Sequence, residues 1–139
     1  MSAEKQNPFD ESELTTILVV SDLKESKSFY IDKLGAELFR EYAGSSIVLK
    51  FLGHWILLVT SGDPTGDKPD IHFVPPKDRN SVDHSFTIRV NDCHKSYQVL
   101  KERGLSFITA PYDRGAEIRC FFQDPDGHLF EISEYKQSN

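Results

Sequence analysis

Two stretches of the sequence repeat each other and decide the fold: residues 15–22 read TTILVVSD, and residues 85–92 read SFTIRVND. In both stretches apolar side chains recur at every second position before an Asp, a pattern that is typical of a half-buried β-strand. The faces predicted to lie against a helix consist of Thr16, Leu18 and Val20 in the first strand and Phe86, Ile88 and Val90 in the second.

A helix is predicted directly after each of these strands. Asp22 is a suitable N-cap residue for a helix over Leu23–Leu34, because its side chain can accept hydrogen bonds from the first N–H groups of the helix. Asp92 has the same place before a second helix over Cys93–Arg103, and a glycine follows each helix. The two Asp residues are 70 positions apart, so the chain contains a strand–helix repeat.

Each half has room for three more strands, which makes each half a βαβββ unit. The strands are predicted at 36–42, 45–52 and 53–58, then at 105–110, 116–123 and 127–132. We expect an α+β fold in which two tandem βαβββ modules form an open, cleft-containing mixed β-sheet barrel, as one structural domain overall. The expected parts are a loosely attached or disordered N-terminus (1–12), the first module (13–60), a linker rich in proline (61–82), the second module (83–135) and a tail (136–139).

The composition limits the possible functions. The 139 residues include 16 basic and 22 acidic side chains, for a net charge of −6, whereas nucleic-acid binders normally have a basic face. No apolar run approaches the length of a membrane-spanning helix, and the polar N-terminus lacks the apolar segment of a signal peptide. We therefore expect a cytoplasmic protein without nucleic-acid or membrane partners, in which Cys93 and Cys120 are free thiols.

Two motifs resemble a known family. Residues 17–38, ILVVSDLKESKSFYIDKLGAEL, are similar to the opening module of the vicinal oxygen chelate superfamily, and residues 124–134, DPDGHLFEISE, are similar to its closing strand. This superfamily includes glyoxalase I, bleomycin-resistance proteins, fosfomycin-resistance enzymes and extradiol dioxygenases. The resemblance covers about residues 13–135 and implies the paired-module fold, but the fold hosts several reactions and also ligand-sequestering proteins.

The resemblance also implies where a divalent metal would be held. Enzymes of the superfamily take metal ligands from the first and last strands of each half, at places occupied here by Thr15, Leu57, Ser85 and Glu131. Hydroxyl and alkyl side chains are not usual ligands of zinc, manganese or iron. We therefore expect no metal cofactor, with a divalent metal (Zn, Mn or Fe) bound through Glu131 and His84 as the alternative.

His84 requires a separate argument, because it directly precedes Ser85 and is a ligating residue type. It shares the parity of Phe86, so we expect it to face the helix side rather than the cleft. A bulge at the start of the strand would turn it inward. His54 and His128 each follow the glycine of a turn and are expected to be exposed.

Strand parity predicts the remaining site residues. Glu131 is expected to face the cleft as a catalytic base, a counter-ion or a salt-bridge partner. Arg89, in the middle of a strand, needs a partner, which is either Glu131 or an anionic ligand. Trp55 is expected to give an aromatic platform or simple packing at the cleft floor. The residues predicted to bind a ligand are Thr15, Trp55, Leu57, Ser85, Thr87, Arg89, Phe122 and Glu131.

Three functions remain open at this point. The first is a metal-free protein that binds a small molecule in a cleft between the two modules, as in the bleomycin-resistance branch. The second is a divalent-metal-dependent lyase, transferase or dioxygenase with Glu131 as a ligand, and the third is a metal-free enzyme with Glu131 as the base. The sequence does not decide whether the protein is an enzyme. Paired copies are common in the superfamily, and open edge strands favour pairing, so we expect a homodimer.

Overall fold

The computed structural model describes residues 7–136 and contains two four-stranded mixed sheets. Part of the expected N-terminal segment (1–6) and part of the tail (137–139) lie outside the described residues. The elements of the first module are β1 (Thr15–Val19), α1 (Leu23–Ser28), η1 (Phe29–Lys33), β2 (Glu37–Tyr42), β3 (Ser46–Phe51) and β4 (His54–Val59). Those of the second module are β5 (Phe86–Arg89), α2 (Cys93–Glu102), β6 (Tyr112–Asp113), β7 (Glu117–Gln123) and β8 (Leu129–Tyr135).

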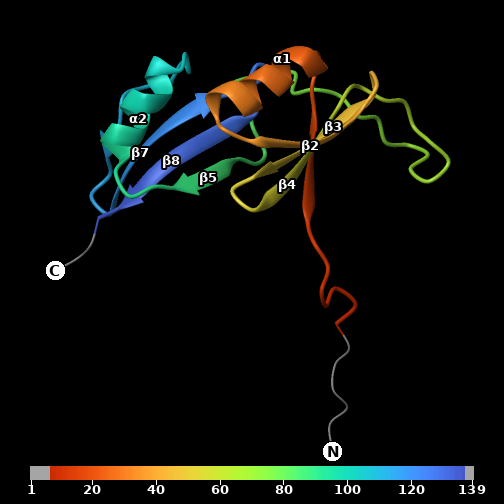
Figure 1. Ribbon diagram of the computed structural model, residues 1–139, viewed down its shortest axis with the longest axis horizontal. Helices are drawn as coiled ribbons and strands as arrows, with labels where there is room; N and C mark the ends of the chain where they lie inside the picture. Colours follow the sequence, from red (N-terminus) through yellow and green to blue (C-terminus); the bar gives the residue numbers. More distant parts are fainter. Residues whose placement is uncertain (1–6, 137–139) are drawn as a thin grey trace, which may run out of the picture.

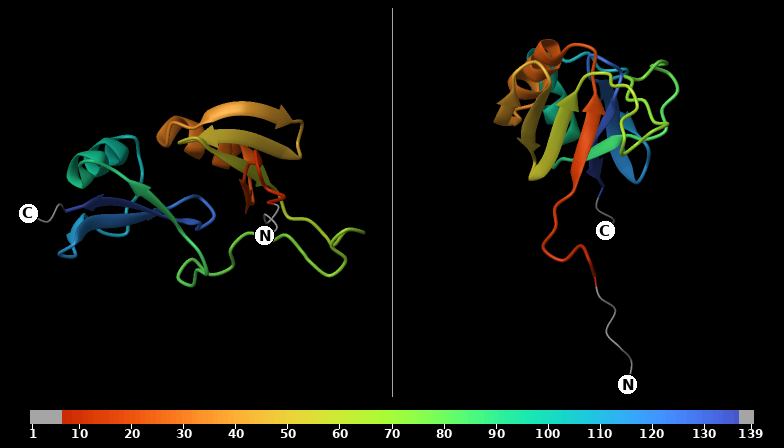
Figure 2. Two further views of the ribbon diagram at one scale, coloured as in Figure 1. Left: turned by 90° about the horizontal axis from the view of Figure 1, so that it is seen from below. Right: turned by 90° about the vertical axis from the view of Figure 1, so that its right-hand side faces the viewer.

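The two modules have the same topology, which confirms the predicted fold. The strand order is β1-β4-β3-β2 in the first sheet and β5-β8-β7-β6 in the second. In each sheet the first and last strands of the module pair in parallel, and the other neighbours are antiparallel. Figure 1 and Figure 2 show the two sheets side by side, with both helices on one side of the molecule and the N-terminal segment projecting from the other.

The first helix begins where the sequence predicts but changes its winding halfway. The Asp22 side chain accepts hydrogen bonds from the N–H groups of Lys24 and Glu25, as an N-cap does. After α1 the chain continues as the π-helical turn η1, in which the Leu34 N–H donates to the Phe29 carbonyl at 3.3 Å. The prediction of one α-helix over 23–34 is therefore wrong for the second half of that range, which is π-helical.

The strand expected at 105–110 is absent from the described residues. Only an isolated bridge joins Phe107 to Phe122 there, and the regular pairing starts later, at the two-residue strand β6. Pro111, which has no N–H to donate to a β-ladder, lies between this bridge and β6.

The predicted alternation of faces is confirmed in both modules. Leu18 of β1 and Val20, directly after β1, are buried on the helix side, whereas Ile17 is exposed and Val19 is half-buried. In the second module, Phe130 and Ile132 of β8 are buried on the helix side in the same way. The largest fully buried side chains are Tyr30, Phe122, Phe130, Leu18, Leu49, Leu58 and Ile132. The helices thus cover one face of each sheet and leave the opposite faces uncovered.

A buried carboxylate joins the two modules. Asp124, directly after β7, is 1% exposed, and its Oδ2 accepts a hydrogen bond of 2.6 Å from the Tyr30 hydroxyl of η1. Its Oδ1 accepts from the backbone N–H groups of Asp126 and His128, at 3.0 and 2.8 Å. The His128 ring lies against Oδ2, with an Nδ1–Oδ2 distance of 2.7 Å. A buried charge is tolerated only when it is fully partnered, so this carboxylate fixes η1 to the β7–β8 turn.

The linker is fastened to the same turn. Arg79 donates from its guanidinium to the carbonyls of Pro125 and Asp124, at 3.0 and 3.3 Å, and its own carbonyl accepts from the Gln123 amide at 2.7 Å. A Cβ at Gly127 would lie 3.0 Å from the Arg79 Cγ, and Gly127 has a φ of +98°, so only glycine fits under the arginine. None of the helices within residues 7–136 is long and apolar enough to cross a membrane.

We predict that Tyr30→Phe lowers the free energy of unfolding by about 1–3 kcal/mol, because it leaves a buried carboxylate one hydrogen bond short. Burial and the neighbouring Asp124 raise the pKa of Tyr30 well above its ordinary value. Above about pH 10 the unfolded chain releases this proton while the folded chain keeps it, so stability falls as the pH rises. This fall should be shallower in the variant. Urea unfolding at pH 7 and at alkaline pH measures both effects.

The matched control is Tyr97→Phe, because Tyr97 packs its ring against Phe107 and its hydroxyl has no hydrogen bond within the described part of the chain. Equal losses of stability in the two variants would contradict a joining role for Asp124.

Candidate functional site

Glu131 lies on the face of the second sheet that the helices leave uncovered. Its Oε1 accepts a hydrogen bond of 3.0 Å from the Thr87 hydroxyl, its direct neighbour on β5. Its Oε2 lies 3.6 Å from Nη1 of Arg119, which projects from β7. Glu131 is 7% exposed, so its carboxylate is buried against these partners. The structure thus places Thr87 and Glu131 together, as strand parity predicts.

The same face continues as a second ion pair. Arg89 of β5 donates from Nη1 to the Glu117 carboxylate at 3.0 Å and to the Ser133 hydroxyl at 2.6 Å. The Ser133 hydroxyl in turn donates to Glu117, and Arg119 contacts the other oxygen of Glu117 at 3.2 Å. The predicted partner of Arg89 was Glu131 or an anionic ligand, whereas the structure gives it Glu117. Four charged side chains thus contact one another in sequence along this face: Glu131, Arg119, Glu117 and Arg89. We call these four residues, together with the hydroxyl-bearing Thr87 and Ser133, the ion-pair row.

The ion-pair row has two acidic and two basic side chains, so its formal charges cancel. The hydrogen bond from Ser133, and then the guanidinium of Arg89, lower the pKa of Glu117 below its ordinary value. Arg89 also lies over the Tyr135 ring, 3.8 Å from its centroid. The face therefore presents polar groups that are already oriented by one another, which suits hydrogen bonding to a polar molecule without net charge.

Aromatic and apolar groups occupy the corresponding face of the first module. Trp55 of β4 packs edge-on against Phe39, with ring centroids 4.9 Å apart, and the Lys50 ammonium lies 4.6 Å from the Trp55 ring. The indole N–H donates to Glu13 at 2.6 Å. Thr15 is the register partner of Trp55 on β1, and Ile17 that of Leu57. Thr15 and Trp55, two of the predicted ligand-binding residues, are therefore neighbours.

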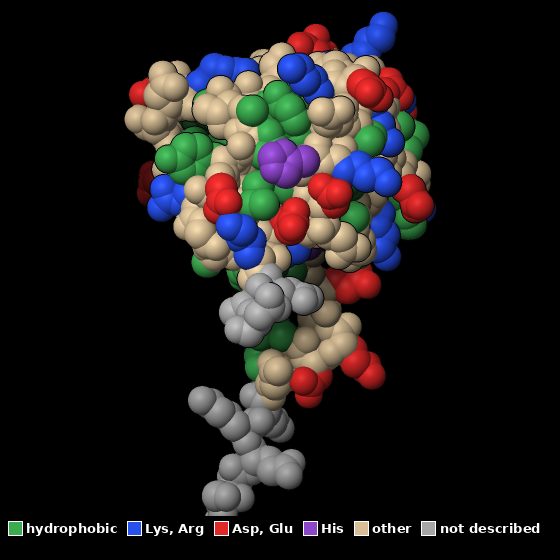
Figure 3. Space-filling model, turned by 90° about the vertical axis from the view of Figure 1, so that its left-hand side faces the viewer, with side chains coloured by type: hydrophobic (Ala, Val, Ile, Leu, Met, Phe, Trp, Pro, Cys, Tyr) green, Lys and Arg blue, Asp and Glu red, His purple; other side chains and the backbone are tan. Residues whose placement is uncertain are grey.

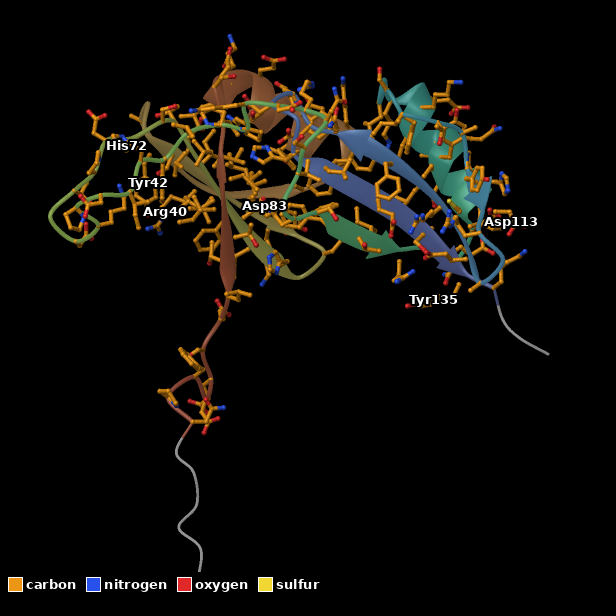
Figure 4. All side chains as sticks on the ribbon, turned by 180° about the vertical axis from the view of Figure 1, so that it is seen from behind. Arg40, Tyr42, His72, Asp83, Asp113 and Tyr135 are labelled. Atoms are coloured by element: carbon orange, nitrogen blue, oxygen red, sulfur yellow. The ribbon has the colours of Figure 1, made fainter. Side chains whose placement is uncertain are left out.

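A cavity of about 370 Å³ lies between the modules. Its walls come from Ile17 and Val19 of β1, from Val74 within the linker, from His84 just before β5, and from Leu129 of β8. We call it the junction cavity. Asp83, which also lines it, precedes β5 and lies between the two modules, while Asp113 and Tyr135 lie at the far end of the second module (Figure 4). Leu129 is two positions from Glu131 on the same strand, so the junction cavity adjoins the ion-pair row.

The residues present do not fit a divalent metal. Of the four places that the resemblance assigns to ligands, Thr15 and Ser85 offer exposed hydroxyls and Leu57 offers no donor. Glu131 remains, and its carboxylate is held by Thr87 and Arg119. Within residues 7–136 no group of three His, Cys, Asp or Glu side chains is placed to hold a metal ion. Paired copies of the chain would supply the same residue types at these places.

Three histidines differ from their predicted surroundings: His54 and His128 are not exposed, and His84 lines the junction cavity. His84 packs edge-on against Phe86, with centroids 5.9 Å apart, and its Nδ1 lies 2.7 Å from the Asp83 carboxylate. No hydrogen bond or ion pair joins it to Glu131 in the described part of the chain. His54 is half-buried and hydrogen-bonded to Thr16. His128 was expected to be exposed but is buried, because Asp124 draws it into the junction between modules.

Phe122 was predicted to bind ligand, but the structure places it on the face away from the cleft. Its side chain is fully buried on the helix side, where it stacks on Phe130 at a centroid distance of 5.3 Å. The adjacent Phe121 has the cleft-facing position, opposite Glu131 in the sheet register. The sequence prediction missed Glu117, Arg119 and Ser133, although the same alternation that identifies Glu131 places all three on its face.

The cysteines are free thiols, as predicted, and both are buried. Burial raises the pKa of the Cys120 thiol to about 12, and burial also raises the pKa of Cys93. A thiol acts as a nucleophile in its ionised form, so neither cysteine is suited to catalysis at neutral pH.

Comparisons with known proteins agree with this architecture. A family model described as Glyoxalase/Bleomycin resistance protein/Dioxygenase superfamily matches residues 14–132. The chain is 26% identical over 135 residues to a lactoylglutathione lyase of Neisseria meningitidis, covering 91% of this chain and 92% of that one. It is 31% identical over 120 residues to the metallothiol transferase FosB of Staphylococcus epidermidis, covering 81% of this chain and 74% of that one.

A solved structure extends the comparison. The crystal structure of a glyoxalase/bleomycin resistance protein/dioxygenase from Nocardioides superimposes with a TM-score of 0.73 at 20% identity, covering 99% of this chain and 89% of that one. At this identity the likeness shows the fold alone.

We predict that Ser133→Ala raises the pKa of Glu117 toward its ordinary value, because the Ser133 hydrogen bond is the largest cause of the lowering. The stabilisation by Glu117 is present above the ordinary glutamate pKa and is lost as the pH falls through the lowered value. An NMR titration of the side-chain carboxyl carbons measures the shift. Arg119→Gln serves as the comparison and should raise the pKa less; a larger rise in Arg119→Gln would contradict the described order of causes.

Proposed function

Because the chain belongs to the Glyoxalase/Bleomycin resistance protein/Dioxygenase superfamily, we propose that it binds a small organic molecule between its two modules, without a catalytic metal. The observation that supports this most is the state of Glu131. Of the four places at which the family's enzymes hold a metal, Glu131 is the one with a carboxylate. Thr87 contacts one of its oxygens and Arg119 the other. A side chain so engaged has a structural and ligand-orienting role.

The proposed ligand occupies the junction cavity and extends along the ion-pair row. The cavity volume of about 370 Å³ lies in the range of small-molecule sites, and both modules contribute to its walls. Ile17, Val19 and Leu129 would contact the apolar part of the ligand, and Thr87 and Ser85 on β5 and its approach offer hydroxyl groups beside it. Trp55 and Leu57 line the neighbouring face of the first module.

The charges of the site favour a ligand without net charge. Each guanidinium of the ion-pair row already has a carboxylate partner, so a charged ligand would have to displace one of these pairs. Figure 3 shows acidic and basic side chains interspersed over the outer end of the second module, with no field of one sign. The net charge of −6 supports the expectation that nucleic acid is not a partner; the cytoplasmic location and the absence of membrane partners stay predictions.

A metal-dependent enzyme is the second candidate, and the names of two relatives favour it: one is a lactoylglutathione lyase, the other a metallothiol transferase. Three of the four ligand places depart from that chemistry in this chain, as described above. A metal-free enzyme with Glu131 as base is the third, and there Arg119 would hold the carboxylate ionised and Thr87 would fix its direction.

We propose that the protein acts as a homodimer. The uncovered side of the first module leaves large apolar side chains in water, with Ile17, Phe39 and Tyr42 each about half exposed or more. The strands β2 and β6 are open edges of their sheets. A second copy would cover part of this surface and complete the enclosure of the ligand.

We predict that the purified protein contains far less than one transition-metal ion per chain, and that a chelator leaves its thermal midpoint unchanged. Glu131 alone cannot hold a transition metal tightly, because the other three ligand places carry no ligating side chain. Loss of even a residue that supports a metal ligand typically lowers the metal affinity about 10- to 100-fold. Elemental analysis and thermal unfolding with and without EDTA measure this. Zinc or manganese near one per chain, lost in Glu131→Gln, would establish the metal-dependent enzyme instead.

We predict that a thermal-shift screen of uncharged organic molecules yields a ligand whose binding is weakened at least about tenfold by Ile17→Asp, which puts a charge into the wall of the cavity. The matched control is Ile108→Asp, at an exposed loop position remote from the cavity lining, which should bind as the wild type does. Glu131→Gln should leave most of the affinity for an uncharged ligand. Equal losses in the two aspartate variants would argue against the junction cavity.

A further inference from the structure

A second concave site lies on the helix side of the molecule, behind the sheet that bears the ion-pair row. It is a groove of about 340 Å³ between α2, the helix-facing residues of β5 and β8, and the β3–β4 turn. Ile132 lines this groove, whereas its neighbour Glu131 points to the opposite face. The groove and the junction cavity share no lining residue, so they are separate sites.

The groove reaches the core rather than resting on the surface. Ile132 and Leu34, which are 1% and 9% exposed, line its inner part, and the half-buried Val90 and Leu100 contribute to its sides. Protein interiors are packed as densely as organic crystals, and an open apolar hollow of this size is the usual form of a ligand site.

The rim of the groove includes a residue in an unfavourable state. Leu52 has a φ of +52°, in the left-handed region that glycine and asparagine prefer, and it is 71% exposed. Backbone strain and a large apolar side chain in water both cost free energy, and no packing within the described chain offsets them at this position. An apolar occupant of the groove would offset these costs, because Leu52 and Val99 lie at the edges of the groove and would contact it.

One charged side chain lines the groove. Of the ten residues that form its described walls, Lys95 is the charged one, and the others are apolar apart from Ser96. No ion pair or side-chain hydrogen bond involves the Lys95 ammonium within residues 7–136. An apolar hollow with a cation at its margin is complementary to a hydrocarbon chain that ends in an anionic group.

We propose that this groove binds a single-chain amphiphilic carboxylate of the medium-chain fatty-acid class. The hydrocarbon chain lies against Ile132, Val90 and Leu100 under Leu52, and the carboxylate pairs with Lys95. Because the occupant contacts the β3–β4 turn of the first module and α2 of the second, its binding stabilises the contact between modules.

Calorimetric titration with decanoate, below its aggregation concentration, tests the proposal. We expect one saturable site per chain. Lys95→Gln should weaken decanoate binding about fivefold, as an exposed ion pair does, and leave the binding of 1-decanol unchanged. Lys101→Gln, on the same helix but outside the groove, is the matched control. Leu52→Asn relieves the backbone strain, so it should raise the thermal midpoint while it weakens both ligands.

Absence of saturable binding in the wild type would overturn the proposal, as would unchanged decanoate affinity in Val99→Asp, which puts a charge on the rim. An equal loss for decanoate and 1-decanol in Lys95→Gln would overturn the carboxylate assignment. A dimer that Val99→Asp converts to a monomer, without any decanoate binding, would show that a second copy covers the groove. The proposed ligand site in the junction cavity is tested independently of this groove, because Ile17→Asp should weaken binding there and leave decanoate binding intact.

Discussion

The structure depends on one buried carboxylate, that of Asp124. Taking a carboxylate out of water is costly unless every acceptor site is filled, and the donors come from both modules: the Tyr30 hydroxyl from the first, and the Asp126 and His128 N–H groups with the His128 ring from the second. The same turn receives the linker through Arg79. The requirement to satisfy this acidic group therefore constrains the relative position of the two sheets, together with the packing of Phe29 and Tyr30 against Phe122 and Phe130.

That position in turn determines the site. The β7–β8 turn delivers the chain into β8, whose alternate residues serve two purposes. Phe130 and Ile132 complete the core on one side, and Glu131 and Ser133 join the ion pairs on the other. A shift of β8 by one residue would exchange these two sets. The register of β8 consequently sets both the packing of the core and the orientation of the ion-pair row. The junction cavity lies where β1, the linker and the β7–β8 turn meet.

Local patterns in the sequence predict most of the fold. The repeated strand–Asp–helix pattern identifies both modules, and parity places Glu131, Thr87 and Arg89 on the uncovered face. The errors arise where a long-range contact decides. His128 is buried because Asp124 needs a donor, and η1 winds as a π-helix although the sequence pattern there is that of an ordinary helix. Phe121 and Phe122 alternate, and the choice between them depended on the register of β7, which becomes plain only from the pairing with β8.

The most direct test of a metal-free binding site between the modules is a map of where a ligand perturbs the protein. Amide chemical shifts recorded by ¹H–¹⁵N NMR, during titration with an uncharged ligand and in the presence of EDTA, give this map. The account predicts that the largest changes fall on Ile17, Val19, Leu129 and Glu131, around the junction cavity. Changes confined to the outer faces of the helices, or binding that disappears when EDTA is added, would contradict it.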